Sequence, residues 1–231
     1  MNISLYVILV GYNKIFDISW IFPQNVNLIF VDNSTKEDVK NKNKSYCSLN
    51  NYIYVDMEGN KGIPAAYNKG ILNIDLSPQN FIMFLDQDTV LPNLFFQKII
   101  KMISEKKFDF FFPIVKDSLG IMSPCKVKGK SFYHSDFCDF NKYIENYSFI
   151  NSGMCVRSTV FHKIKYDESL FLDFADHDFI KSAKLLNCFK FYVNKEIVVN
   201  QLFSGAQKNN FESDFIRFSI FVHDGVVYYK K

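Results

Sequence analysis

The feature that most constrains this chain is a short apolar run that stops at two carboxylates. Residues 81–85 read Phe-Ile-Met-Phe-Leu, the length expected of a strand buried on both faces, and Asp86 and Asp88 follow it. Because side chains alternate along a strand, Asp86 and Asp88 point to one side and Gln87 to the other. Two such carboxylates repel each other unless a cation lies near them, and a divalent ion carried by a diphosphate is one solution. A strand that merely ends in a polar turn is the alternative, since Asp is common in turns.

Further apolar runs alternate with helical segments, which is typical of an open α/β sheet. Strands are expected near 3–10, 27–31, 52–55 and 109–115, and helices after Pro64, over 93–106, from Asp176 and over 211–229. Asp32 ends the second run as Asp86 ends the central one, which indicates a shared ligand edge at the carboxyl ends of parallel strands. Residues 116–147 show no clean period, and we interpret them as an insertion or lid.

Composition limits the classes of function. The net charge of +3 is spread along the chain with only two arginines, which disfavours a nucleic-acid partner but leaves a phosphorylated substrate or peripheral contact with an anionic membrane possible. Five cysteines without a Cys-x-x-Cys spacing indicate reduced thiols in a cytoplasmic protein. The first apolar run is too short to span a bilayer, so we expect neither a signal peptide nor a membrane helix.

Two glycines precede the helix that begins near Pro64. The spacing of Gly59 and Gly62 would let the backbone approach a ligand, with the helix N-terminus available to a phosphate or ribose. A capped turn explains the same residues about as well. No Gly-Lys-Ser/Thr follows, so this is not a P-loop.

The second half carries a small-residue bend at 151–153 and then a group of acids, Asp173, Asp176 and Asp178. N-capping of a helix accounts for one acid but not for three within six residues. A carboxylate opposite the first acid pair could instead remove a proton from an acceptor hydroxyl. We interpret His177, between two of these acids, as a solvent-facing helix residue, with a role in metal binding as the alternative.

These stretches, in this order, resemble the family 2 glycosyltransferases of the GT-A fold, and within them the rhamnosyltransferase-like group. The matching motifs are Val-Asp-Asn-Ser at 31–34, Asn-Lys-Gly-Ile-Pro-Ala-Ala-Tyr-Asn-Lys-Gly-Ile at 60–71, Leu-Asp-Gln-Asp-Thr at 85–89, Asn-Ser-Gly at 151–153 and Asp-Glu-Ser-Leu-Phe-Leu-Asp-Phe-Ala-Asp at 167–176. The resemblance implies a Rossmann-like three-layer α/β sandwich with a mostly parallel central sheet. It also implies one domain over 1–231, with a nucleotide-sugar-binding half (1–92) and an acceptor-binding half (93–231).

The resemblance implies a nucleotide-diphosphate-sugar donor, sugar transfer with inversion, and a divalent metal, Mg²⁺ or Mn²⁺. Asp32 would contact the base, Asp88 would hold the metal and Asp176 would act as the catalytic base. The implied donor-binding residues are Gly11, Tyr12, Asp32, Asn60, Gly62, Asn68, Asp86 and Gln87. The motif spellings lean toward dTDP-rhamnose as donor and toward a glycan or lipid-linked glycan of a bacterial surface polysaccharide as acceptor.

Two departures from the family pattern keep other functions open. Asn200 stands where many relatives carry a metal-binding histidine, and Lys181 stands where they often carry an arginine. A catalytically weak or inactive relative that binds a nucleotide or glycan is therefore one alternative. A nucleotidyltransferase is another, although such an enzyme would carry a glycine-rich loop after the first strand, where this chain has only Gly11.

Overall fold

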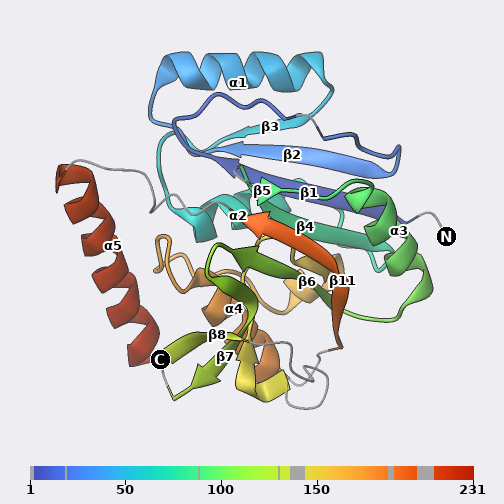
Figure 1. The fold of residues 1–231 in the computed structure, drawn as a ribbon. Coiled ribbons are helices and arrows are strands. Elements are labelled where there is room, and N and C mark those ends of the chain that lie inside the picture. Colours follow the sequence, from blue (N-terminus) through green and yellow to red (C-terminus); the bar gives the residue numbers. More distant parts are fainter. Residues whose placement is uncertain are drawn as a thin grey trace.

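The chain folds around one mixed sheet with helices on both faces (Figure 1). The structure is a computed structural model that describes residues 3–18, 20–87, 89–129, 131–135, 144–186, 190–201 and 211–231. Among these residues the sheet has 11 strands, and its main path runs β3-β2-β1-β4-β10-β6-β11-β5. Strands from both halves of the chain share this sheet.

Four parallel strands form the part of the sheet built by the first half of the chain. They are β1 (Ser4–Gly11), β2 (Val26–Asp32), β3 (Ile53–Asp56) and β4 (Asn80–Asp86). The register places Gly11 beside Asp32, and Val10 beside Asp86. The ends of β2 and β4, with Asp32 and Asp86, therefore lie at one edge on either side of the end of β1, as the sequence predicts.

The second half adds strands of both directions. They are β5 (Thr89–Val90), β6 (Phe110–Asp117), β7 (Gly120–Lys128), β8 (Ser131–Ser135), β9 (Tyr147–Ser148), β10 (Cys155–Arg157) and β11 (Phe191–Gln201). β10 lies antiparallel between β4 and β6, whereas β11 runs parallel to β6. The expectation of a lid over 116–147 is wrong for its described part, because β7 pairs with β6, β8 and β9 and so extends the sheet.

Helices cover the two faces of the sheet and complete three layers. They are α1 (Glu37–Leu49), α2 (Ile63–Ile71), α3 (Phe95–Glu105), α4 (Ala175–Leu185) and α5 (Phe211–Lys230), with short 3-10 turns at Ile144–Asn146 and Ser158–His162. Buried residues of α2 and α4 share one core with the sheet, and those of α1 and α3 share the other. α5 stands at one side of the molecule (Figure 1).

Alternation along β4 decides which face receives its acid. Ile82 and Phe84 pack into the core of α2 and α4, whereas Met83 and Leu85 pack into the core of α1 and α3. The next residue, Asp86, therefore belongs to the face of α2 and α4. This is the face on which Asp176 enters its helix.

Three cysteines, Cys47, Cys125 and Cys155, are buried free thiols, while Cys138 and Cys188 lie outside the described residues. No helix in the described part of the chain combines the length and apolar character that crossing a bilayer requires.

Candidate active site

Asp86 lies where three distant segments converge. Its Oδ2 accepts hydrogen bonds from the Ser152 hydroxyl and, at 3.1 Å, from Gln201 Nε2 at the end of β11. Its backbone N–H donates to Thr89 Oγ1 at 3.2 Å. The bend at 151–153 that the sequence predicts thus serves to bring a hydroxyl to the acid. Asp88, the predicted metal ligand, lies outside the described residues.

Gln201 is a contact that the sequence analysis missed. The family pattern points to Asn200, but Asn200 is exposed and pairs with Val90, while Gln201 contacts Asp86. Alternation alone does not find this contact, because Gln201 shares the side of Val199, which packs into the core of α1 and α3, whereas Asp86 belongs to the other face. Gln87 behaves as predicted and turns away from Asp86, donating from Nε2 to the Ile15 carbonyl at 3.2 Å.

Two buried tyrosines belong to the core that α2 and α4 share with the sheet. Tyr67 on α2 and Tyr166 have ring centroids 5.1 Å apart, and the Tyr166 hydroxyl donates to Asn151 Oδ1 at 2.8 Å. Burial raises the pKa of both phenols well above the usual value, and the negative charges of Asp86 and Asp176 raise both further. This core covers the face of the sheet to which Asp86 and Asp176 both belong.

Asp176 differs from the other two acids of its group in having no lysine or arginine partner among the described residues, and the nearest basic group is His177 Nε2 at 3.9 Å from its Oδ1. Arg217 donates two hydrogen bonds of 2.5 and 2.7 Å to the Asp173 carboxylate. Lys231 Nζ lies 2.8 Å from Asp178, which is 4% exposed. Asp176 accepts one hydrogen bond from the backbone N–H of His177 at 2.8 Å, and its side chain is 22% exposed. Asp176 is therefore the acid of this group that remains available as a proton acceptor.

The expectation that His177 faces solvent is wrong. Its ring stacks on Phe132 with centroids 3.7 Å apart, and Nδ1 lies 2.7 Å from the Ser148 hydroxyl. Burial lowers the pKa of His177, and the charge of Lys184 acts in the same direction, while Asp176 opposes both. The β7–β8 hairpin, absent from the sequence-based prediction, supplies the ring that covers this histidine.

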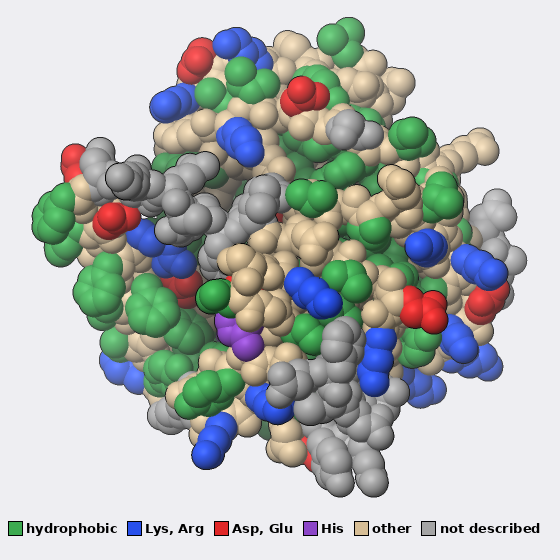
Figure 2. All heavy atoms as spheres, in the orientation of Figure 1, with side chains coloured by type: hydrophobic (Ala, Val, Ile, Leu, Met, Phe, Trp, Pro, Cys, Tyr) green, Lys and Arg blue, Asp and Glu red, His purple; other side chains and the backbone are tan. Residues whose placement is uncertain are grey.

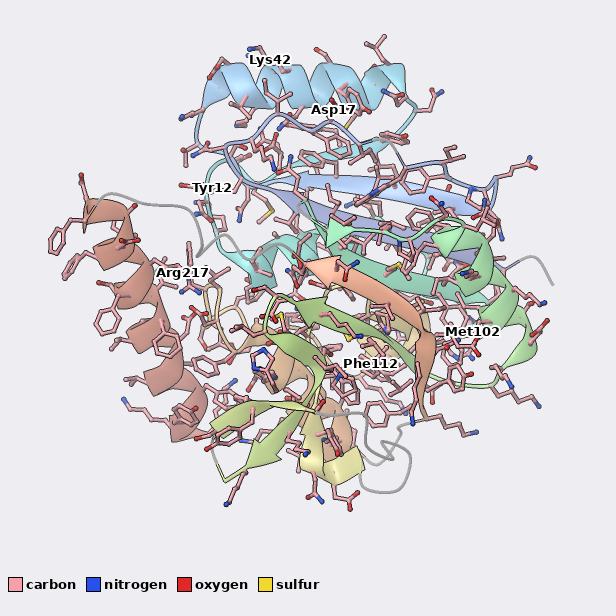
Figure 3. All side chains as sticks on the ribbon, in the orientation of Figure 1. Tyr12, Asp17, Lys42, Met102, Phe112 and Arg217 are labelled. Carbon is pink, nitrogen blue, oxygen red and sulfur yellow. The ribbon has the colours of Figure 1, made fainter. Side chains whose placement is uncertain are left out.

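A cavity of about 390 Å³ adjoins the carboxyl end of β1. Tyr12, Asn60 and Gly62 of the predicted donor-binding set line it, together with Asn33, loop residues Phe171 and Leu172, and residues of α5 that include Arg217. Figure 3 shows Arg217 between α5 and the body of the molecule, with Tyr12 nearby at the end of the sheet. α5, which no sequence motif connects with the site, supplies one wall of the cavity.

Two residues of the predicted donor-binding set, Asp32 and Gly11, do not line this cavity and are engaged within the protein instead. Asp32 is fully buried, and its carboxylate accepts bonds from the Ser34 N–H, Asn43 Nδ2 and the Tyr54 hydroxyl at 2.9 to 3.2 Å. To contact a nucleotide base, as predicted, Asp32 would have to give up one of these hydrogen bonds. A Cβ atom at Gly11 would collide with the Phe30 ring, so glycine is needed there for packing.

The N-terminus of α2 is already occupied by protein. The Ile63 N–H donates to the Phe171 carbonyl at 2.7 Å, and Pro64 has no N–H to offer. Gly62 has φ of 85°, and a Cβ atom there would lie 2.6 Å from the Phe171 oxygen. At this helix end, where a phosphate or ribose site is expected, the Ile63–Phe171 hydrogen bond instead connects the two halves of the chain.

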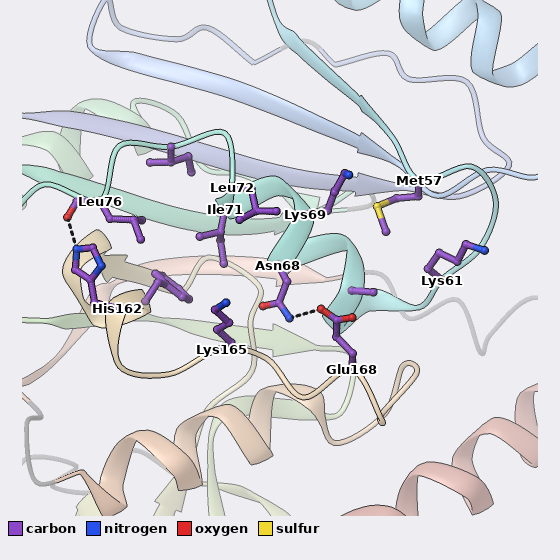
Figure 4. Close-up of a pocket in the computed structure, with 13 residues that line it drawn as sticks. Met57, Lys61, Asn68, Lys69, Ile71, Leu72, Leu76, His162, Lys165 and Glu168 are labelled. Atoms are coloured by element: carbon purple, nitrogen blue, oxygen red, sulfur yellow. Dashed lines mark hydrogen bonds between the residues drawn. The ribbon is translucent and has the colours of Figure 1, made fainter.

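Asn68 is not brought together with the other predicted donor-binding residues. Its Nδ2 donates to the Tyr166 carbonyl at 2.9 Å and to Glu168 Oε1 at 2.8 Å, and its Oδ1 accepts the Tyr166 N–H. It lines a separate cavity of about 840 Å³ with Lys61 and Lys165 (Figure 4). This larger cavity lies away from the acids, and Asn68 serves there to hold the loop that leads to Asp176.

The residues suited to a metal are hard oxygen donors around Asp86. No group of three or more His, Cys, Asp or Glu side chains that could hold a metal ion occurs within the described ranges, which exclude Asp88. Carboxylate and amide oxygens from β4 and β11 nevertheless match the preference of Mg²⁺ and Mn²⁺.

Comparison with known proteins agrees with this arrangement. The family model described as Glycosyl transferase family 2 matches residues 12–164. The dTDP-rhamnosyl transferase RfbF of Shigella flexneri is 25% identical over 185 residues, which cover 76% of this chain and 62% of RfbF. The chain therefore spans about three fifths of the length of this curated relative.

Solved structures show the same fold. The S. aureus TarS 1–349 complex with UDP-GlcNAc has a TM-score of 0.62 at 18% identity, covering 91% of this chain and 61% of TarS 1–349. GalNAc-T7 with UDP, GalNAc and Mn²⁺ has a TM-score of 0.66 at 14% identity, covering 90% of this chain and 46% of that protein. These likenesses confirm the predicted GT-A fold with its mostly parallel central sheet.

Proposed function

Since the chain belongs to glycosyl transferase family 2, we propose that it transfers a sugar from a nucleotide-diphosphate donor to a hydroxyl group with inversion at the sugar carbon. One observation carries this proposal: Asp86, at the carboxyl end of β4, and Asp176, at the start of α4 and without a lysine or arginine partner among the described residues, belong to the same face of the sheet. A donor and an acceptor held between these acids would meet in one place.

Asp176 is the proposed general base. Its carboxylate takes the proton of the acceptor hydroxyl while that oxygen bonds to the anomeric carbon, and the bond from this carbon to the diphosphate oxygen breaks on the opposite face. One base and in-line displacement invert the configuration without a covalent intermediate. Asp173 and Asp178 are engaged in ion pairs, so their proposed role is to fix the loop before α4 and the start of α4.

The donor is proposed to enter between the 390 Å³ cavity and Asp86. Tyr12 and Asn60 line the part of the cavity nearest β1 and offer an aromatic face and an amide to a nucleoside. Mg²⁺ or Mn²⁺, held by Asp88 with Asp86 close by, would offset the charge that develops on the departing diphosphate. GalNAc-T7, a structural neighbour, binds Mn²⁺ in this fold.

The donor and acceptor are proposed from the similarity to RfbF. RfbF is named as a dTDP-rhamnosyl transferase, so dTDP-rhamnose is the first donor to test. A growing surface glycan, free or lipid-linked, is the proposed acceptor, and the proposed location is the cytoplasm with contact at the inner face of the membrane.

The test is donor turnover by the purified chain with Mn²⁺ or Mg²⁺, using dTDP-rhamnose, UDP-GlcNAc and UDP-GalNAc. We expect slow hydrolysis of one donor, lost in Asp88→Ala and retained in Asp75→Asn, whose exposed acid lies away from the site. Absence of binding and turnover with every donor would count against the transferase.

A second candidate is a relative that binds the nucleotide without transferring the sugar, which the exposed Asn200 in place of a histidine favours. Calorimetry that detects metal-dependent nucleotide binding, with no turnover on any acceptor, would support it. No observation favours the nucleotidyltransferase.

A further inference from the structure

α5 presents a continuous apolar stripe to solvent. The stripe comprises Phe211, Phe215, Phe218, Val222, Val226 and Tyr229, and we call it the outer stripe. These side chains are between 37% and 85% exposed, and the apolar surface of this helix gathers on one side of the molecule (Figure 2). An apolar patch of this extent on a folded protein usually marks a contact surface.

The helix cannot rotate to bury this stripe, because its opposite side is fixed. Asp224 is fully buried and accepts the backbone N–H groups of Phe171, Leu172 and Asp173 at 3.0, 2.7 and 2.8 Å. Arg217 pairs with Asp173, and Lys231 pairs with Asp167 and Asp178. These anchors hold α5 against the loop before α4, so the outer stripe stays directed away from the body, except at its end, where the Tyr229 ring also contacts Phe174 with centroids 5.6 Å apart.

The stripe is nearly symmetric about residue 220. In an antiparallel pair of α5 helices centred there, Phe211 faces Tyr229, Phe215 faces Val226 and Phe218 faces Val222. A large side chain meets a smaller one at the two inner levels, which is how facing layers interdigitate. A two-fold axis through this point makes the surface complementary to itself.

The flanking charges have the same symmetry. Glu212 follows Phe211 by one residue and Lys230 follows Tyr229 by one residue, so both lie on the same flank of the stripe. A two-fold axis perpendicular to the helices places the same flanks together, with Glu212 of one copy near Lys230 of the other. Neither residue forms an ion pair within the described part of the chain.

We propose that a second copy of this chain covers the outer stripe, with the two α5 helices antiparallel about a two-fold axis near residue 220. A 20-residue helix is about 30 Å long. Burying its stripe would remove roughly 1,000–1,200 Å² from water in total, the low end for specific interfaces. Dimerisation in the micromolar range is therefore expected.

Sedimentation analysis of the full chain from about 1 to about 200 µM tests this proposal. A monomer–dimer equilibrium is expected, and Phe218→Asp should weaken it at least tenfold. The matched control is Leu49→Asp, because Leu49 is an 83% exposed apolar residue at the end of α1. Unchanged thermal unfolding of the dilute variants separates loss of association from loss of folding.

A charge exchange tests the antiparallel orientation. Glu212→Lys and Lys230→Glu should each weaken the dimer, and the double variant should restore it, since the pair re-forms with signs exchanged. A chain that stays monomeric throughout, or a dimer indifferent to Phe218→Asp and to both single charge reversals, overturns the proposal. Flotation of a monomeric chain with phosphatidylcholine–phosphatidylglycerol vesicles, lost in Phe218→Asp, would overturn it in favour of a membrane surface.

Discussion

Replacing Asp224 by Asn tests how α5 is joined to the candidate active site. The buried carboxylate accepts three successive backbone N–H groups from the loop that precedes Asp176, and His223 Nδ1 lies 2.9 Å from its Oδ1. An amide has nearly the same shape, but one of its two ends is a donor. Whichever way it turns, at least one N–H of the loop meets another donor in a place without water.

The magnitude follows from these bonds. A hydrogen bond to a charged group contributes about 1.5–3 kcal/mol and one between neutral groups about 1 kcal/mol. Asp224→Asn loses one bond and weakens two others, so the free energy of unfolding should fall by about 3 kcal/mol. For a chain of this size the unfolding temperature should fall by roughly 6–12 °C.

Urea unfolding followed by circular dichroism measures this change. Asp214→Asn is the matched control, because it removes an exposed acid from the first turn of the same helix and should change stability by less than about 0.5 kcal/mol. A change below about 0.5 kcal/mol for Asp224→Asn would refute the claim that this carboxylate secures the loop.

Three further outcomes are expected. Asp176→Asn should lower sugar transfer by roughly 10²–10⁴-fold while calorimetry shows unchanged nucleotide affinity, and a lower affinity would contradict its role as base. Gly62→Ala should lower the free energy of unfolding, measured in urea, by about 2–4 kcal/mol because its Cβ would meet the Phe171 oxygen. The matched control is Gly59→Ala, which should lower it by less because Gly59 has a positive φ but open space around it. Burial lowers the pKa of His177, so as pH falls the unfolded chain binds a proton at this residue before the folded chain does. The free energy of unfolding should therefore decrease as pH falls below about 6.5. His177→Gln should remove this part of the pH dependence.

Local patterns were sufficient to predict the edge of the sheet at which Asp32 and Asp86 lie. Alternation along residues 81–88 predicted the opposite directions of Asp86 and Gln87, and the apolar runs predicted the four parallel strands. The helical spacing of the apolar residues after Asp176 also predicted the start of α4. These features depend on neighbours within a few residues, which a sequence displays directly.

The errors concern contacts between distant residues. Gln201 reaches Asp86 across 115 positions, and Asn68 is held by a loop about 100 positions away. The β7–β8 hairpin was missed because its strands mix polar and apolar residues without a period, and β7 gains its place by pairing with β6. Asn68 and Asp32 are both suited to bind a ligand, and their protein partners become visible only in the folded chain.

The two buried tyrosines have an electrical consequence. Because neither phenol ionises near neutral pH, Tyr67 and Tyr166 add uncharged ring and hydroxyl to the face of the sheet that holds Asp86 and Asp176, and such material screens a charge far less than water does. A charge brought to this face would therefore act over a longer distance than at the protein surface, without any movement of the backbone.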